Sequence, residues 1–197
     1  MNLFAHYAAV LLCSVLTLAS VSADGVDTSA PSIFLIAKPE LQDPNFAQSV
    51  VLVVFPKDGG PVGVILNRPT RLTLKDGFPG EAQLKDRGDT LYFGGPVQTE
   101  GLMYLFRGGG NGNHAFAVVG DLYLSADARL LDRLLSTNPT MVQRYFLGYA
   151  GWTGPQLEHE IALGAWYVIE ADTETIEHAD PKTLWRDLML RASAVKT

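Results

Sequence analysis

The side chains best suited to hold a ligand lie at the ends of predicted strands. Asn67 and Arg68 follow directly on an apolar run at 62–66 that is typical of a strand. The guanidinium of Arg68 is a planar fork of donors that suits a carboxylate or a phosphate, and Asn67 can both donate and accept. Two interpretations stay open: both residues face a ligand groove, or Arg68 is buried and holds a loop through backbone carbonyls.

A second group of residues follows the predicted strand at 90–93. Gly94 and Gly95 permit a positive φ or a close backbone approach, either to a neighbouring chain segment or to a ligand. Tight packing is the favoured interpretation of this glycine pair. Gln98, three residues further on, can line the same groove as Asn67.

A third group surrounds the start of a predicted helix. Thr153 and Gln156 have capping-box spacing, and Trp152 precedes them. Free amides at a helix N-terminus beside an indole suit an anion or an aromatic ligand, although Trp152 can also cover the core while the caps use the amides. The candidate ligand groove therefore comprises the following residues: Asn67, Arg68, Gly94, Gly95, Gln98, Trp152 and Gln156.

No catalytic signature accompanies these residues. The histidines at 114, 159 and 178 lack the spacing of zinc ligands, and no G-x-S-x-G motif is present. Ser49 and Ser125 occupy a predicted strand start and a predicted helix cap. We expect no metal and no cofactor, and the catalytic residues of any enzyme activity stay unknown.

The first 23 residues have the pattern of an export signal. They contain no Lys, Arg, Asp or Glu, and the apolar run at 8–21 leads to Val21-Ser22-Ala23. This pattern predicts cleavage before Asp24 and a periplasmic address. The alternative is a retained N-terminal membrane anchor, but an apolar core of about 14 residues is short for a span of roughly 20.

The chain after the predicted cleavage site carries the net charge of −6 and no cysteine, because Cys13 leaves with the leader. Disulfides, cysteine nucleophiles and thiolate metal sites are therefore excluded from the mature chain. The acidic balance gives no bulk attraction to nucleic acid, which makes a nucleic-acid partner an unfavoured prediction. No stable membrane insertion is expected once the leader is gone.

The elements that must position the candidate residues are strands first and helices later. After a flexible lead-in at 24–32, the turn residues Asp43-Pro44-Asn45-Phe46 separate two strands, and 70–90 is a long polar connection. The predicted strands are 33–37, 50–55, 62–66, 90–93, 102–106, 115–119, 122–124 and 165–169. The run at 50–55 is apolar throughout and indicates a strand buried on both faces, paired as a hairpin with 62–66.

Helical patterns concentrate in the second half. Ser125 can cap a helix with an apolar leucine stripe that ends before Asn138-Pro139, Thr153 opens another, and Asp180-Pro181 opens the last. The segment GGGNGN at 108–113 is interpreted as a hairpin tip rather than a phosphate-binding loop. The order of elements favours one α+β domain at 33–197 around a mixed sheet.

Five ordered segments resemble one known family. They are LIAKPELQDPNFAQSVVLV (35–53), GPVGVILNRPT (60–70), YFGGPVQTEG (92–101), GDLYLSADARLL (120–131) and FLGYAGWTGPQLEHEIALGAWYV (146–168). Together they resemble the AlgH-like (YqgE-like) family of bacterial proteins, from about residue 33 to 191. The resemblance implies a compact α+β fold whose mixed sheet curls into a partial barrel with helices outside, and it implies no established reaction or ligand.

The resemblance leaves the function open between three hypotheses. We favour a non-catalytic binding or regulatory module of the envelope, with a small molecule or a protein as its partner. The alternative is an uncharacterised hydrolase that uses Asp, Glu and His. A transcriptional regulator, as some family members are labelled, is disfavoured because no helix-turn-helix or basic helix is visible and because most family members lack a leader.

Overall fold

The computed structural model of the chain describes residues 31–108 and 114–194. The predicted leader at 1–23, its cleavage site and most of the 24–32 lead-in lie outside these residues, as does 109–113 of the glycine-rich segment. At the end of the lead-in, Ser32 is buried and its hydroxyl donates to the carbonyl of Val118 at 2.9 Å.

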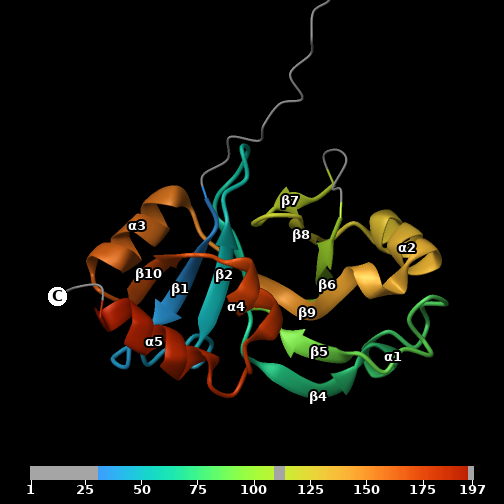
Figure 1. The fold of residues 1–197 in the computed structure, drawn as a ribbon, viewed down its shortest axis with the longest axis horizontal. Coiled ribbons are helices and arrows are strands. Elements are labelled where there is room, and N and C mark those ends of the chain that lie inside the picture. Colours follow the sequence, from blue (N-terminus) through green and yellow to red (C-terminus); the bar gives the residue numbers. More distant parts are fainter. Residues whose placement is uncertain (1–30, 109–113, 195–197) are drawn as a thin grey trace, which may run out of the picture.

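The described chain forms ten strands and five α-helices (Figure 1). The strands are β1 Ile33–Ala37, β2 Val50–Val54, β3 Val62–Ile65, β4 Pro69–Thr73, β5 Thr90–Phe93, β6 Val97–Arg107, β7 Phe116–Ala117, β8 Leu122–Ser125, β9 Val142–Gly151 and β10 Trp166–Glu170. The helices are α1 Leu74–Gly77, α2 Ala128–Thr137, α3 Gly154–Ala162, α4 Thr173–His178 and α5 Leu184–Ala194, with a 3₁₀ turn at Pro139–Met141.

The strands form one curled, half-barrel sheet in the order β10-β1-β2-β3-β9-β6-β8-β7, to which β4 and β5 are joined. All pairs are antiparallel except β5 with β9, so the sheet is mixed. The long strand β9 pairs with β3 near its end and with β5 and β6 along its length, and it therefore connects the two halves of the molecule. The α+β class with a partly barrel-like sheet and outer helices is confirmed.

Helices cover both faces of the sheet around β1 and β2 (Figure 1). Leu184 and Leu188 of α5 pack on one face, and Leu157 of α3 packs on the other. Every residue of β2 is buried for this reason, which confirms the prediction from its unbroken apolar run. At the other end of the molecule, α2 packs its leucines on Tyr104 and Tyr145 of β6 and β9.

The predicted strands at 33–37, 50–55, 62–66 and 90–93 are confirmed to within one residue at each end. The interpretation of 70–90 as a long polar connection is wrong, because β4 and α1 begin it. β4 is mostly exposed and starts at a proline, so it lacks the apolar pattern by which a buried strand is recognised.

Three further differences concern the second half. The chain at 142–151 is the strand β9, and the short helix α4 precedes α5, which begins at Leu184 rather than at Pro181. The cap of α2 is Asp127, whose carboxylate accepts from the amide of Leu130 at 2.7 Å. Ser125, three residues before the helix begins, instead accepts from the amide of Asp127.

Candidate functional site

Asn67 and Arg68 contact a loop of the protein itself. The carboxamide of Asn67 accepts from the amide of Val50 and donates to the carbonyl of Gln48, both at 2.9 Å. Arg68 donates to the carbonyls of Pro44 at 3.1 Å, of Asn45, and of Ala47 at 2.8 Å. Arg68 therefore holds a loop through its backbone carbonyls, which is the second of the two interpretations left open by the sequence.

The local sequence explains why this loop presents its carbonyls to Arg68. The amide of Asn45 donates to the side chain of Asp43 at 2.8 Å, and the amides of Phe46 and Ala47 both donate to the Asp43 carbonyl. This tight turn leaves the next carbonyls without intraloop partners, and a guanidinium can satisfy several at once. Burial lowers the pKa of Arg68, and the nearby carboxylate of Asp43 opposes this shift.

Trp152 and Gln156 complete the same arrangement from the other side. The ring of Phe46, at the tip of the loop, lies 6.2 Å from Trp152 and 5.6 Å from Trp166. Both indole N–H groups donate to one oxygen of Glu160, at 3.1 and 3.0 Å, and Gln156 donates to its other oxygen at 3.0 Å. We call Asn67, Arg68, Trp152, Gln156, Glu160 and Trp166 the loop anchor.

Sequence reasoning missed Glu160 and Trp166 as members of the loop anchor. Glu160 lies in the charged stretch Glu158-His159-Glu160, a pattern typical of a solvated helix face. The spacing of four residues between Gln156 and Glu160 would have indicated a side-chain pair on one face of the helix. Thr153 caps that helix by accepting from the amide of Gln156 at 3.2 Å, so part of the predicted anion-binding end is already occupied.

Gly94 and Gly95 serve close backbone packing. A β-carbon on Gly94 would lie 2.3 Å from the carbonyl oxygen of Gly148, and one on Gly95 would lie 2.3 Å from the carbonyl carbon of Tyr149. Real β-carbons do not approach backbone atoms so closely. The glycine pair therefore lets the turn after β5 lie directly against β9, which agrees with the favoured interpretation of tight packing.

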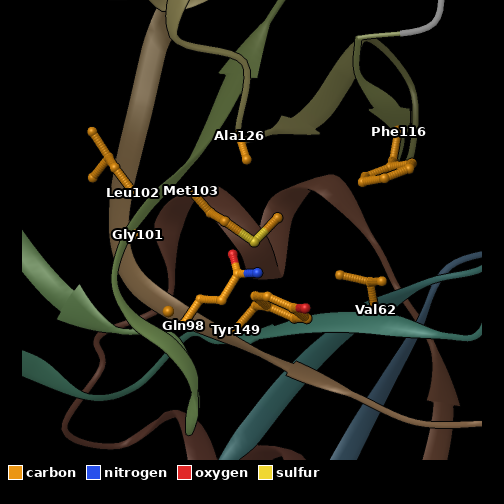
Figure 2. Close-up of a pocket in the computed structure, with 9 residues that line it drawn as sticks. Val62, Gln98, Gly101, Leu102, Met103, Phe116, Ala126 and Tyr149 are labelled. Carbon is orange, nitrogen blue, oxygen red and sulfur yellow. The ribbon is translucent and has the colours of Figure 1, made fainter.

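Gln98 lies apart from the loop anchor and lines a cavity of about 330 Å³. Figure 2 shows its amide above the ring of Tyr149 and close to the sulfur of Met103, with Phe116 and Ala126 across the cavity. The seven predicted residues thus do not form one groove. The loop anchor holds four of them, the packed glycines are two more, and Gln98 belongs to the cavity.

An irregularity in the sheet creates this cavity. Between the pairs Val97–Tyr149 and Leu102–Leu147, β6 contains four intervening residues whereas β9 contains only Gly148. The extra β6 residues, 98–101, bulge away from the ladder, and Gly148 adopts a φ of 67°. Gln98 itself has a φ of 47°, which is uncommon for a residue with a side chain and often marks a functional position.

The cavity is mainly apolar, with two polar side-chain groups. Val62, Met103 and Phe116 supply the apolar lining. Among residues 31–108 and 114–194, neither the amide of Gln98 nor the hydroxyl of Tyr149 makes a side-chain hydrogen bond. An apolar cavity with a few unused polar groups has the composition of a small-molecule site.

A histidine and a carboxylate lie next to residues of the cavity. Nδ1 of His114 is 3.0 Å from the Asp127 carboxylate, whose pKa is lowered mainly by the hydrogen bond from the Leu130 amide. The neighbouring Ser125 is fully buried, and its hydroxyl donates to the carbonyl of His114. Ser, His and Asp are therefore close together, but the serine oxygen is not accessible for attack on a substrate.

Arg144 is a half-buried cation that sequence reasoning did not single out. It donates to the carbonyls of Leu66 at 3.2 Å and Ile176 at 3.3 Å, and its guanidinium lies 4.9 Å from the centre of the Tyr92 ring. Burial lowers its pKa. Its contacts join β9 to β5, to α4 and to the residue that follows β3.

Neither a metal site nor a membrane-spanning helix is found in the described part of the chain. No group of three or more His, Cys, Asp or Glu side chains there is placed to hold a metal ion. No helix there is long and apolar enough to cross a bilayer.

Comparison with protein families gives one consistent result. A family model described as AlgH-like matches residues 34–195. A UPF0301 protein of Streptomyces avermitilis is 35% identical over 166 residues, which are 80% of this chain and 83% of that protein. A UPF0301 protein of Myxococcus xanthus is 37% identical over 171 residues, which are 84% of this chain and 91% of that protein.

Solved structures agree with the sequence matches. The solution structure of the AlgH protein from Pseudomonas aeruginosa is similar with a TM-score of 0.66 and 30% identity, over 88% of this chain and 92% of that one. A crystal structure of a Corynebacterium diphtheriae protein has a TM-score of 0.61 over 82% of this chain and 86% of that one. At 23% identity, the second likeness concerns the fold alone.

Proposed function

The chain belongs to the AlgH-like family, whose biochemical function is not established, and from this premise we propose that it is a non-catalytic binding module. Its site is the cavity between β6 and β9. The loop anchor is excluded from this role because its donors and acceptors are already engaged within the chain.

The observation that carries the proposal is a mainly apolar cavity of about 330 Å³, open to solvent, that is lined by the exposed Gln98 and the half-buried Tyr149, whose side chains form no hydrogen bond among the described residues. A carboxamide and a phenol can both donate and accept, so they fix the orientation of a ligand without requiring a charge. The thioether of Met103 and the ring of Phe116 favour a flat apolar body. The ligand class is therefore a small, uncharged, partly aromatic molecule with an amide or hydroxyl group.

Export is a second part of the proposal. The uncharged first 23 residues, the apolar run at 8–21 and the small residues before Asp24 support a cleaved leader and a periplasmic binding module. Mass spectrometry of the protein recovered from a periplasmic extract tests this part. An N-terminus at Asp24 is the expected result, and an intact Met1 in the membrane fraction would support the anchor instead.

The binding site is tested with 4-fluorobenzamide, whose ring and amide match the two halves of the cavity. Fluorine NMR titration measures its affinity for the purified protein and for Gln98→Leu and Tyr149→Phe. Each variant is expected to bind about tenfold more weakly, since one hydrogen bond to the ligand is lost. Glu100→Gln is the matched control, because Glu100 is an exposed member of the same bulge and does not line the cavity. Equal affinity in all four proteins would contradict the site.

A further inference from the structure

The strand β10 leaves one edge of the sheet open. Within the described ranges, 31–108 and 114–194, it pairs only with β1. Lys38 donates its amide to the carbonyl of Ala165, and Ala171 donates to Ser32, so odd-numbered residues direct their backbone groups toward β1. The N–H and C=O groups of Trp166, Val168 and Glu170 consequently point away from β1, toward the outside.

This edge lacks the protection that the other edges have. β7 is only two residues long, and β4 starts with a proline and carries Arg71 at its centre. Such features discourage pairing with another strand. β10 contains no proline and no bulge, and its single charged residue, Glu170, is at its end.

A groove of about 300 Å³ follows the open edge between two helices. Ile161 of α3 and Ala192 of α5 line it together with residues of β10. Val168, at the middle of the strand, is 41% exposed. Leu163, which lies between α3 and β10, is 73% exposed.

We propose that β10 pairs antiparallel with β10 of a second copy, about a two-fold axis at Val168. Centring the pair there places Val168 opposite Val168 of the second copy, and Tyr167 opposite the second copy's Ile169. Every outward N–H and C=O of the strand then has a partner, because residues that point outward on one copy meet outward residues on the other. Aromatic and β-branched pairs of this kind stabilise antiparallel strands.

The charges at the two ends of the strand suit this arrangement. Glu170 of the second copy falls at the level of Trp166, which is the end where Lys38 lies beside Tyr167. The two copies of Glu170 are kept at opposite ends of the interface, so that no like charges face each other across it. Because both copies contribute the same surface to an interface of this type, the assembly is complete as a dimer.

The segment that precedes β1 is a poorer occupant of this edge. Residues 24–30, DGVDTSA, are mainly small and polar and have low strand propensity. The inference does not depend on the cavity between β6 and β9, which lies away from this edge.

Cysteine cross-linking tests the proposed axis. Residues directly opposite in a hydrogen-bonded antiparallel pair have Cα atoms about 5.5 Å apart, which is within the range of a disulfide. In a Cys13→Ser background, Val168→Cys is expected to oxidise to a covalent dimer, because its symmetry mate lies directly opposite. Leu72→Cys is the matched control, since Leu72 is 46% exposed on the edge strand β4.

Sedimentation velocity of the unmodified protein and of Val168→Lys over a concentration series supplies the second measurement. The unmodified protein is expected to reach twice the mass of one chain, and Val168→Lys is expected to stay monomeric because it places two like charges on the axis. Circular dichroism establishes that this variant is folded. The proposal is overturned if the unmodified protein is monomeric throughout, or if Val168→Cys cross-links no faster than Leu72→Cys.

Discussion

Arg68 and Gln98 are both long polar side chains next to strand ends, yet their surroundings differ completely. Arg68 donates to three carbonyls of the 43–49 loop, with Phe46 of that loop held between two indoles. Gln98 projects into an apolar cavity, where neither it nor Tyr149 has a side-chain hydrogen bond among the described residues. Arg68 therefore serves the fold, whereas the amide of Gln98, exposed beside an apolar cavity, stays available to a molecule from outside the chain.

The largest expected effect comes from the glycines that pack the turn after β5 against β9. Gly95→Ala places a methyl group against the backbone of Tyr149 and Ala150. We expect the free energy of unfolding, measured in urea, to fall by about 3 kcal/mol or more. Gly88→Ala is the control, because its added methyl group meets nothing within 4 Å. Equal stability of the two variants would show that β9 can move away from the turn.

The loop anchor is tested next. Arg68→Ala removes the donors for the carbonyls of Pro44, Asn45 and Ala47, and the expected loss of stability is roughly 2 kcal/mol. Arg71→Ala should change stability by less than about 0.5 kcal/mol, since Arg71 is exposed and has no hydrogen bond or ion pair in the described ranges. A stable Arg68→Ala protein that instead loses binding of 4-fluorobenzamide would reverse the roles of the two regions.

Two buried tyrosines of the same core differ in whether the side-chain hydroxyl forms a hydrogen bond. Tyr104 donates to the carbonyl of Asp127 at 2.9 Å, whereas the hydroxyl of Tyr145 is buried without a partner in the described structure. Tyr104→Phe should therefore lower the free energy of unfolding by about 1 kcal/mol, and Tyr145→Phe should leave it unchanged or raise it. Thermal unfolding of both variants measures the difference, and a larger loss at Tyr145 would point to a bound water there.

The same two tyrosines are expected to lower the stability of the protein at alkaline pH and to have no such effect at neutral pH. Burial raises the pKa of Tyr104 and of Tyr145 from 10.0 to about 12. Because the folded-state pKa is raised, the stabilisation is complete below pH 10 and is lost as the pH rises toward 12. Ultraviolet titration of phenolate should show two tyrosines that ionise only as the protein unfolds. Ionisation of all tyrosines near pH 10 in the folded protein would contradict their burial.

The sequence was sufficient for the apolar elements and insufficient for contacts between distant segments. The run at 50–55 predicted a strand buried on both faces because unbroken apolar β-branched residues require cover on both sides. β4 escaped prediction because its residues are mostly exposed, and β9 escaped because Arg144 and three glycine or alanine positions interrupt its alternation. The conformation of these two strands depends on pairing with neighbouring strands and not on their own residue pattern alone.

The candidate site shows the same limit. The seven predicted residues do not come together in one groove, and Arg68 takes the loop-holding role that the sequence left open. The sequence could not show that the 43–49 loop returns to fill the space between Arg68 and Trp152, since the turn and its partners are more than 20 residues apart. Nor could it show the four-residue bulge of β6 that opens the cavity, because that bulge is defined by its register with β9.

The cavity, and not the loop anchor, is the region that we propose receives the ligand. Proton–nitrogen correlation spectra recorded during titration with 4-fluorobenzamide test it directly, because every backbone amide of both regions reports in one experiment. We predict that the largest shifts occur at Gln98, Met103, Phe116, Ala126 and Tyr149, and that residues 43–49 and 152–160 stay unchanged. Shifts confined to 43–49 and 152–160 would contradict the account.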